Sequence, residues 1–497
     1  MKKMTTIGAI ILSLMLIITV SSFANETLVI SQNTEANTLH PLAMRMAPEQ
    51  SIASNIYDSL VDREPSGKLV PGLATSWELL DENTWRFYLR KGVKWQTGTP
   101  FTADDVVFTF EDIGRTKINR YKFIMNRIKV VKKIDDYTVD IITTSPYAVL
   151  ADSFYQTMFI MSKEYTTGKS DAYLAEHPMG TGPYRLIEWV RDSHMHLEAF
   201  DGCWKGKPPI KKVTFRPITN DATRLAGLIT GEIGLTTDVP VQYIDLVKKA
   251  PAVDVVERGG MRIIYFSFNL REQGLPINNE KVRRALMLGI NEKEIVEKIL
   301  MGHAEIATQL PAPFFRGFNK DLVRPEYNPE LARKLIKEAG YPNGIDLRVN
   351  VTNDRYVMDN EIGVAVAQQL SKIGVRVDLV AQPASIHFKQ GNEFKHVFSL
   401  GGWGDATFDS ARILKTLLVQ RSLVPDKDFI NALEAADKIT DLEKRQQKLA
   451  ELNKYVLDKT FIIPLHYQAD VYGVNKNIKG FVPNVKKVLN LDKLSFE

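Results

Sequence analysis

The residues of this chain best suited to hold another molecule lie in one glycine-rich segment, from Gly401 to Arg412. Its glycines let the backbone approach a ligand closely, and Trp403 offers a flat apolar face. Asp405 and Asp409 supply carboxylates that can meet a cation through charge-assisted hydrogen bonds. Two structural roles remain open: Asp405 also fits hydrogen bonding within its loop, and Asp409 also fits the cap of a helix that begins at Ser410. The segment predicts non-covalent binding.

Three other places offer binding groups. Arg355 and Tyr356 stand between an expected strand and an expected helix, and the arginine fork can hold a carboxylate or phosphate with two hydrogen bonds. Met44 and Arg45 follow the first expected strand, and Tyr467 ends one of the last. An ordinary surface arginine and a hydrogen-bonded strand end are the alternatives at Arg355 and Tyr467, and the sequence leaves them open.

Residues able to catalyse a reaction or bind a metal are sparse. His194 and His196 project from the same side of an expected strand, but the sequence identifies no third metal ligand. Cys203 is the single cysteine, so no internal disulfide forms and a structural role is expected for it. The sequence contains no nucleophile elbow, P-loop or zincin motif, and His466 with Asp409 is the one acid–base pair to consider. We expect no enzyme activity, no metal site and no cofactor.

Both strands and helices are expected along the chain, and they must position these groups. Hydrophobic alternation at Trp85, Phe87 and Leu89 predicts a strand with one solvated face. The other elements that matter below are a strand at Thr27 to Gln32, helices at Ala103 to Glu111, Asn360 to Lys372 and Thr440 to Leu457, and two final strands at Phe461 to Tyr467 and Val471 to Val474.

The first 24 residues have the pattern of a secretory signal. Lys2 and Lys3 supply the charge, Ile7 to Val20 is apolar, and small residues at Ser22 and Ala24 fit a signal peptidase. We place cleavage after Ala24; an uncleaved anchor is the alternative, although the apolar run is shorter than the roughly 20 residues that a span needs. No cysteine lies near the cut, so we expect a periplasmic protein without a lipid anchor.

Size and charge bound the remaining chain. Most of the 497 residues follow the signal, which is too many for one core and suggests two or three domains. The formal net charge is +5 and no long basic run is present, so nucleic acid is not an expected partner.

The stretch from Ser54 to Glu111 resembles the early region of the extracytoplasmic solute-binding proteins of family 5. That family includes the dipeptide-, oligopeptide-, nickel-, glutathione- and opine-binding proteins of bacterial ABC importers. Further segments resemble the family in its order: 180–189, 268–286, 327–341, 370–380 and 462–473. The resemblance covers essentially the whole mature chain.

The resemblance implies an α/β fold of two lobes that close on a hinge, the class II periplasmic-binding-protein fold with an extra inserted domain. Domain I would be discontinuous and comprise residues 25–56, 181–262 and 472–497. Residues 57–180 would form domain II, and residues 263–471 domain III. The ligand cleft would lie near Met44, Arg45, Arg355 and Trp403.

The resemblance also implies a role: a monomeric periplasmic receptor that binds a small molecule or peptide and delivers it to an inner-membrane ABC permease, and so acts indirectly with its ATPase. Peptide-binding members have an aspartate three residues after the tryptophan, where this chain has Ala406, while Asp405 stands two residues after it. We expect a zwitterionic short peptide or peptide-like solute. An opine, glutathione-like compound or nickel chelate is the alternative ligand, and a chaperone-like or chemoreceptor-coupled protein is the alternative class.

Overall fold

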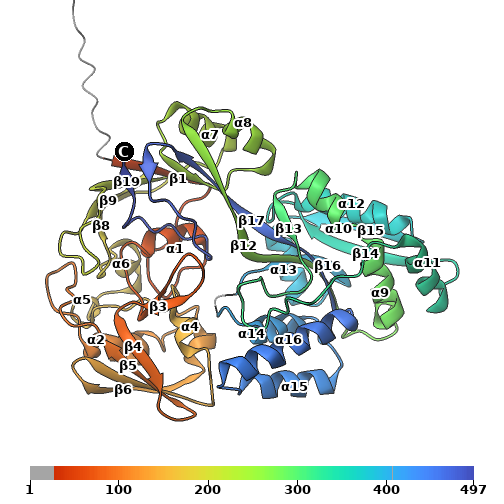
Figure 1. Cartoon of the computed structure of the whole chain (residues 1–497), viewed down its shortest axis with the longest axis horizontal. Helices are drawn as coiled ribbons and strands as arrows, with labels where there is room; N and C mark the ends of the chain where they lie inside the picture. Colours follow the sequence, from red (N-terminus) through yellow and green to blue (C-terminus); the bar gives the residue numbers. More distant parts are fainter. Residues whose placement is uncertain (1–26, 406) are drawn as a thin grey trace, which may run out of the picture.

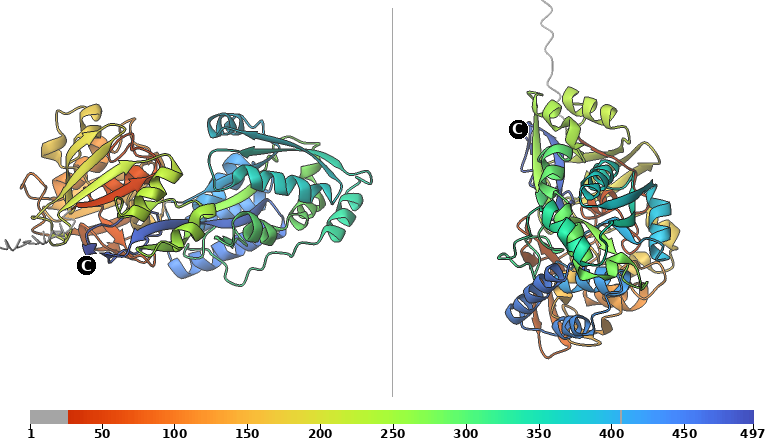
Figure 2. Two further views of the ribbon diagram at one scale, coloured as in Figure 1. Left: turned by 90° about the horizontal axis from the view of Figure 1, so that it is seen from above. Right: turned by 90° about the vertical axis from the view of Figure 1, so that its right-hand side faces the viewer.

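Two long antiparallel strands join the two lobes of the molecule, β12 (Val253–Phe268) and β17 (Ile462–Asn475). Figure 1 shows the first lobe, residues 27–252 and 476–497, on the left and the second lobe, residues 269–461, on the right. Seen from above in Figure 2, β12 and β17 run from one lobe into the other. The computed structural model describes residues 27–405 and 407–497, and the expected signal peptide lies outside them.

One mixed sheet extends through both lobes, because β12 and β17 belong to its middle. Towards the first lobe it continues with β11 (Leu235–Thr237), β1 (Thr27–Gln32), β10 (Lys212–Pro217), β9 (His194–Ala199) and β8 (Tyr184–Val190). Towards the second lobe it continues with β16 (Phe398–Trp403), β14 (Ile345–Thr352) and β15 (Val375–Gln382), and β13 (Ala304–Ile306) pairs with β17. The pairing of β12 with β17 shifts register between Gly259 and Ile263, which marks the junction between the lobes.

Helices with local caps cover the sheet of the second lobe. Asn279 and Asn328 accept hydrogen bonds from backbone amides in the first turns of their helices and so cap them. The helices of this lobe are α9 (Glu280–Gly289), α10 (Glu292–Glu294), α11 (Pro329–Glu338), α12 (Asp359–Ser371), α13 (Ala384–Asn392), α14 (Ser410–Leu414), α15 (Lys427–Asp437) and α16 (Leu442–Asp458), with π-helical turns η4 (Ile295–Ile299) and η5 (Lys415–Arg421).

The first lobe also contains a separate antiparallel sheet in the order β4 (Ala74–Leu79), β5 (Thr84–Leu89), β7 (Thr138–Thr143) and β6 (Ile128–Asp135). Phe87 and Leu89 are buried while Tyr88 is exposed, as the alternation predicts. The other helices of this lobe are α1 (Ala47–Ala53), α2 (Ala103–Val107), α3 (Lys122–Met125), α4 (Leu150–Phe154), α5 (Lys163–Thr166), α6 (Asp171–Glu176), α7 (Asp221–Thr230) and α8 (Ile244–Lys248), with 3-10 or π turns at η1 (Phe108–Ile113) and η2 (Val241–Tyr243).

The two lobes are in contact on the side away from the connecting strands. The guanidinium of Arg63 lies 3.9 Å from the ring centre of Phe408, whose ring also approaches Tyr155 at 6.1 Å. Arg127 of the first lobe forms an ion pair with Asp437 of the second. These contacts hold the lobes in a closed arrangement.

The α/β fold with two lobes is confirmed, and the strand at Thr27 to Gln32 has the predicted bounds. The helix predicted at Ala103 to Glu111 is α-helical only to Val107 and continues as the π-helical turn η1 to Ile113. Two further predicted boundaries are wrong. The final strands at 461–467 and 471–474 are one strand, β17, because the backbone pairing with β12 continues through the polar residues between them. The long helix begins after Asp441 rather than at Thr440, since the Asp441 carboxylate accepts from the amides of Glu443 and Lys444.

Candidate ligand-binding site

A cavity of about 480 Å³ lies between the lobes, within the size range of small-molecule sites. Arg45 and Gln50 line it from the first lobe, and Arg355 and Trp403 from the second. Arg262, on the connecting strand β12, also reaches it. The cavity is therefore built from both lobes and from the strands that join them.

The wall around Trp403 depends on close contact between a glycine and a tyrosine. Gly402 donates its amide hydrogen to the hydroxyl of Tyr356 over 2.9 Å. A Cβ atom at Gly402 would lie 2.5 Å from the Tyr356 ring, so only glycine fits here. Trp403 pairs with Ile263 of β12 and lines the cavity next to Arg421, whose guanidinium lies 5.0 Å from the indole centre.

Asp405 lines the same cavity but is fully buried. Its carboxylate accepts hydrogen bonds from the amide of Thr407 at 2.8 Å and from the indole of Trp403 at 3.2 Å. It also forms an ion pair with Arg412 at 2.7 Å. The carboxylate thus has partners within its own loop, and the role of loop hydrogen bonding accounts for all of these contacts.

Asp409 does not line the cavity, contrary to its expected place beside the ligand. It accepts from the amide of Ala411 and caps α14, as its alternative role predicts. Both of its oxygens also bind Arg445, each at 2.8 Å, and both side chains are 1% exposed. The chain folds this aspartate inward because a buried guanidinium needs a paired carboxylate.

The structure brings Arg45, Arg355 and Tyr356 to the cavity, where the sequence predicts them. It leaves Met44 and Tyr467 outside. Met44 is a buried core residue, since its apolar side chain packs in the first lobe. Tyr467 is also buried, and its hydroxyl lies 2.7 Å from the carbonyl oxygen of Pro311, which explains its position without a ligand.

Several charged residues at the cavity are absent from the sequence-based expectations: Arg262, Arg421, Asp470, Lys486 and Lys487. Burial, followed by repulsion from Arg63, lowers the pKa of Lys486 to about 7, and its ammonium donates to the carbonyl oxygen of Tyr155 at 3.0 Å. A sequence signal exists for Arg262, because it is a charge at the start of the apolar run Ile263 to Phe266. No sequence pattern identifies the other four, which become neighbours only in the tertiary fold.

A family model for the bacterial extracellular solute-binding proteins, family 5, matches residues 68–422, which is well over half of the chain. The chain is a family 5 solute-binding protein. It is similar to the dipeptide-binding protein of Escherichia coli (strain K12), with 28% identity and 89% of each chain covered. It is also similar to the peptide transport periplasmic protein SapA of Salmonella typhimurium, with 29% identity over 87% of this chain and 85% of the relative.

Solved structures agree with this family 5 assignment. HbpA2 from Haemophilus parasuis superposes with a TM-score of 0.85 at 28% identity, covering 95% of this chain and 100% of that one. The shared two-lobed architecture therefore extends over nearly the whole described chain.

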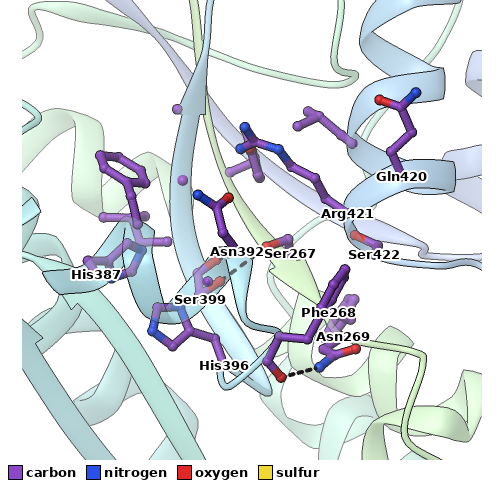
Figure 3. Close-up of a pocket in the computed structure, with 18 of the residues that line it drawn as sticks. Ser267, Phe268, Asn269, His387, Asn392, His396, Ser399, Gln420, Arg421 and Ser422 are labelled. Carbon is purple, nitrogen blue, oxygen red and sulfur yellow. Dashed lines mark hydrogen bonds between the residues drawn. The ribbon is translucent and has the colours of Figure 1, made fainter. Parts of the chain in front are cut away.

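This solute-binding protein has a smaller cavity of about 170 Å³ in its second lobe, which shares Tyr356, Gly402 and Arg421 with the cavity between the lobes. Figure 3 shows the Arg421 side chain extending towards Asn392, with His387 and His396 on the side of the pocket away from Gln420. The two imidazole rings lie 4.5 Å apart, and burial together with the neighbouring His387 lowers the pKa of His396 to about 4. This side pocket is thus lined by neutral imidazoles and one arginine near neutral pH.

Proposed function

We propose that this family 5 protein is the periplasmic receptor of an ABC importer. It captures a short peptide or peptide-like solute between its lobes and delivers it to the permease. The observation that carries this proposal is the cavity of about 480 Å³ whose walls come from both lobes. The similar proteins named for dipeptide binding and peptide transport support the choice of ligand.

The mechanism we propose is capture by closure. A ligand that contacts Arg45 on one lobe and Trp403 on the other binds the closed form better than the open form, and only such a difference in affinity shifts the equilibrium. The permease would then recognise the closed shape, with its ATPase acting indirectly on the receptor.

The same proposal includes a monomer, cleavage after Ala24, release into the periplasm without a lipid anchor, and the three domains with the boundaries given above. Among the described residues no helix is long and apolar enough to cross a membrane.

Binding without catalysis is part of the proposal. His466 is 1% exposed, and neither of its ring nitrogens has a hydrogen-bond partner among the residues that the structure describes. Burial lowers its pKa to about 3. Asp409, its proposed acid partner, is bound instead by Arg445. These positions favour a structural role for both residues.

Native mass spectrometry of protein purified without denaturation, followed by titration with peptide pools, tests the proposal. We expect a trapped or added peptide to bind with one-to-one stoichiometry, to change the fluorescence of Trp403 and to raise the melting temperature. A Trp403→Phe variant identifies the fluorescence signal. Saturable binding of an opine, a glutathione-like thiol or a nickel chelate in place of any peptide would overturn the peptide assignment. Broad, weak binding of unfolded chains without a rise in melting temperature would overturn the receptor role in favour of a chaperone-like one.

A further inference from the structure

The cavity between the lobes carries an excess of positive charge. The cationic side chains that line it are Arg45, Arg262, Arg355, Arg421, Lys486 and Lys487. Among the described residues, two carboxylates line it, and each has a cationic partner already: Asp405 binds Arg412 at 2.7 Å, and Asp470 lies 3.7 Å from Lys487. A ligand entering the cavity therefore meets unneutralised cations.

Four of these cations lack a protein partner. Within residues 27–405 and 407–497, the side chains of Arg45, Arg262, Arg355 and Arg421 make no ion pair and no hydrogen bond; their recorded contacts are to aromatic rings or through the backbone. Arg45, Arg355 and Arg421 are exposed to solvent and Arg262 is half-buried. The fully buried Arg445, by contrast, binds a carboxylate, as a buried guanidinium requires. The open hydrogen-bonding forks at the cavity are therefore available to a ligand.

The arginines that line the cavity come from both lobes and from the connecting strand β12. Arg355 and Arg262 both approach the Tyr356 ring, at 5.6 Å and 5.9 Å. Burial, and after it repulsion by Arg355, lowers the pKa of Arg262. Arg45 lies on the opposite lobe. Closure therefore brings like charges together, which costs free energy unless an anion lies between them.

We propose that the ligand carries two or more carboxylates, as an acidic peptide or peptide-like compound does, and that its charge allows the lobes to close. The proposal rests on the receptor role and names the ligand class for that role. A ligand ammonium finds no unpaired carboxylate among the described lining residues, because Asp405 and Asp470 are both engaged. Without ligand, three of the four arginines are exposed to solvent and Arg262 is half-buried. A neutral or basic peptide would cover these guanidinium groups without pairing them, whereas carboxylates satisfy them.

Isothermal titration with triglutamate, trialanine and trilysine tests this preference. We expect triglutamate to bind at least about tenfold more tightly than trialanine, since each charge-assisted hydrogen bond contributes more than a neutral one. Raising the salt concentration from about 50 mM to about 300 mM should reduce the difference in affinity between triglutamate and trialanine, because salt screens the charges. Equal or tighter binding of trialanine or trilysine would overturn the anionic ligand and leave the receptor role intact. If these probes and the peptide pools all fail to bind, the peptide receptor role itself fails.

Matched variants locate the effect. Arg355→Gln and Arg421→Gln should each weaken triglutamate binding about tenfold while changing trialanine binding about twofold or less. Arg348→Gln is the control, because Arg348 is exposed on β14 and pairs with Asp378 outside the cavity. Circular dichroism verifies that each variant is folded. An equal loss for both peptides would show that the arginines only maintain the shape of the cavity, which would overturn the proposal.

A separate cluster of metal-binding groups lies on the hairpin of β8 and β9. Glu188 is the cross-strand neighbour of His196, and His194 lies two residues earlier on the same face. The Nε2 atoms of His194 and His196 lie 3.3 Å and 3.7 Å from one carboxylate oxygen of Glu188. Glu188 is the third ligand that the sequence did not reveal, because it becomes a neighbour only through strand pairing.

These distances suit a metal ion. Bonds of 2.0–2.1 Å in a tetrahedron place neighbouring ligand atoms about 3.4 Å apart. The Nδ1 atom of His194 lies 2.8 Å from the hydroxyl of Ser193, and that of His196 lies 2.9 Å from the hydroxyl of Thr214. Such outer hydrogen bonds orient imidazoles so that Nε2 faces the metal.

The geometry points to a surface site for one divalent transition metal, Zn²⁺, Ni²⁺ or Cu²⁺, bound by His194, His196 and Glu188. Imidazole nitrogens favour these ions over Mg²⁺ or Ca²⁺. Three protein ligands leave a coordination position open to water. None of the three residues lines the cavity between the lobes, so this site is independent of the peptide site.

Titration of the untagged mature chain with Zn²⁺ in a non-coordinating buffer tests the site. We expect one equivalent to bind, and His194→Gln and Glu188→Gln each to weaken it about tenfold or more. His177→Gln is the matched control, since His177 is an exposed histidine that stacks on Tyr173 and is not part of the cluster of Glu188, His194 and His196. Cu²⁺ loaded into the wild type should show two nitrogen ligands by electron paramagnetic resonance. Unchanged Zn²⁺ binding in His194→Gln, or an equal loss in His177→Gln, would overturn the proposal.

Discussion

Two aspartates four residues apart illustrate how neighbouring side chains of one type serve different purposes. Asp405 holds its loop and reaches the cavity, whereas Asp409 is enclosed with Arg445. From the sequence, either could meet a ligand, because both follow a glycine-rich strand end. Only the position of Arg445 on α16 separates them, and that contact spans 36 residues.

Replacing Asp409 by alanine should destabilise the protein without altering the cavity. The change leaves the buried guanidinium of Arg445 with one more distant carboxylate, that of Asp437 at 3.5 Å, and removes the cap of α14. We therefore expect a loss of about 3 kcal/mol in the free energy of unfolding. Urea denaturation measures this. Asp378→Ala, which breaks an exposed ion pair with Arg348, should change stability little. If Asp409→Ala is as stable as the wild type but binds peptide more weakly, Asp409 contacts the ligand and its structural role is wrong.

Lys486 should make stability depend on pH above neutrality. Its folded pKa is lowered to about 7 by burial and then by Arg63, with Asp405 opposing, from the ordinary value of 10.5. Between these two values the unfolded chain holds a proton that the folded chain lacks, so stability rises with pH across that window and is lowest at and below about pH 7.

The measurement is the free energy of unfolding in urea at about pH 7.5 and about pH 9. One proton over that interval corresponds to about 2 kcal/mol. In Lys486→Met, the increase in the free energy of unfolding between the two pH values should be smaller by this amount. In Lys334→Met, on an exposed face of α11, the increase should be the same as in the wild type. Identical pH slopes for wild type and Lys486→Met would show that Lys486 titrates normally in the folded protein.

At the residue scale, local motifs point to four of the residues that line the cavity, and their contact with a ligand stays a prediction. Trp403, Arg355, Tyr356 and Arg45 lie on its walls as predicted. Arg421 could not be predicted, because it ends a π-helical turn whose orientation depends on packing in the second lobe. The net charge of the cavity therefore depends on residues that only the tertiary fold brings together. The sequence alone, without these residues, predicts a zwitterionic ligand.

At the scale of elements, the connecting strand β17 lacks the sequence pattern that predicts a single strand. Its side chains are buried on both faces through most of its length, so it lacks the alternation that identifies a strand. The polar residues Gln468 and Asp470 look like a break between two strands. Asp470 instead lines the cavity, so the polar interruption marks the junction between the lobes.

The close pairing of β12 and β17 leaves no room for a side chain at Gly260. A Cβ atom there would lie 2.3 Å from the carbonyl oxygen of Gln468, so the two strands would have to move apart. We expect Gly260→Ala to lower the free energy of unfolding by about 1–3 kcal/mol, as overpacking does, and to change peptide affinity. Gly259→Ala is the neighbouring control, because its nearest atom would be a Glu305 carboxylate oxygen at 3.7 Å. Equal behaviour of the two variants in thermal denaturation and titration would show that the strands separate freely here.

At the scale of the whole molecule, contacts between the lobes set how much of the protein is closed. Arg127 and Asp437 pair across the lobes, and neither lines the cavity. If the closed form binds ligand, apparent affinity is the intrinsic affinity multiplied by the closed fraction. Weakening this ion pair should therefore lower the closed fraction and reduce the affinity for peptide, although neither residue lines the cavity.

Arg127→Gln should raise the dissociation constant for peptide about twofold to fivefold, the range expected from loss of a partly exposed ion pair between the lobes. The loss should appear mainly in the dissociation rate, since the closed complex opens more readily, and stopped-flow fluorescence of Trp403 separates that rate from association. Arg115→Gln is the control, because its ion pair with Glu111 lies within the first lobe. Small-angle scattering should show a more open ligand-free form for Arg127→Gln alone. Unchanged affinity together with a more open form would mean that closure does not govern binding, and the capture mechanism would then have to be abandoned.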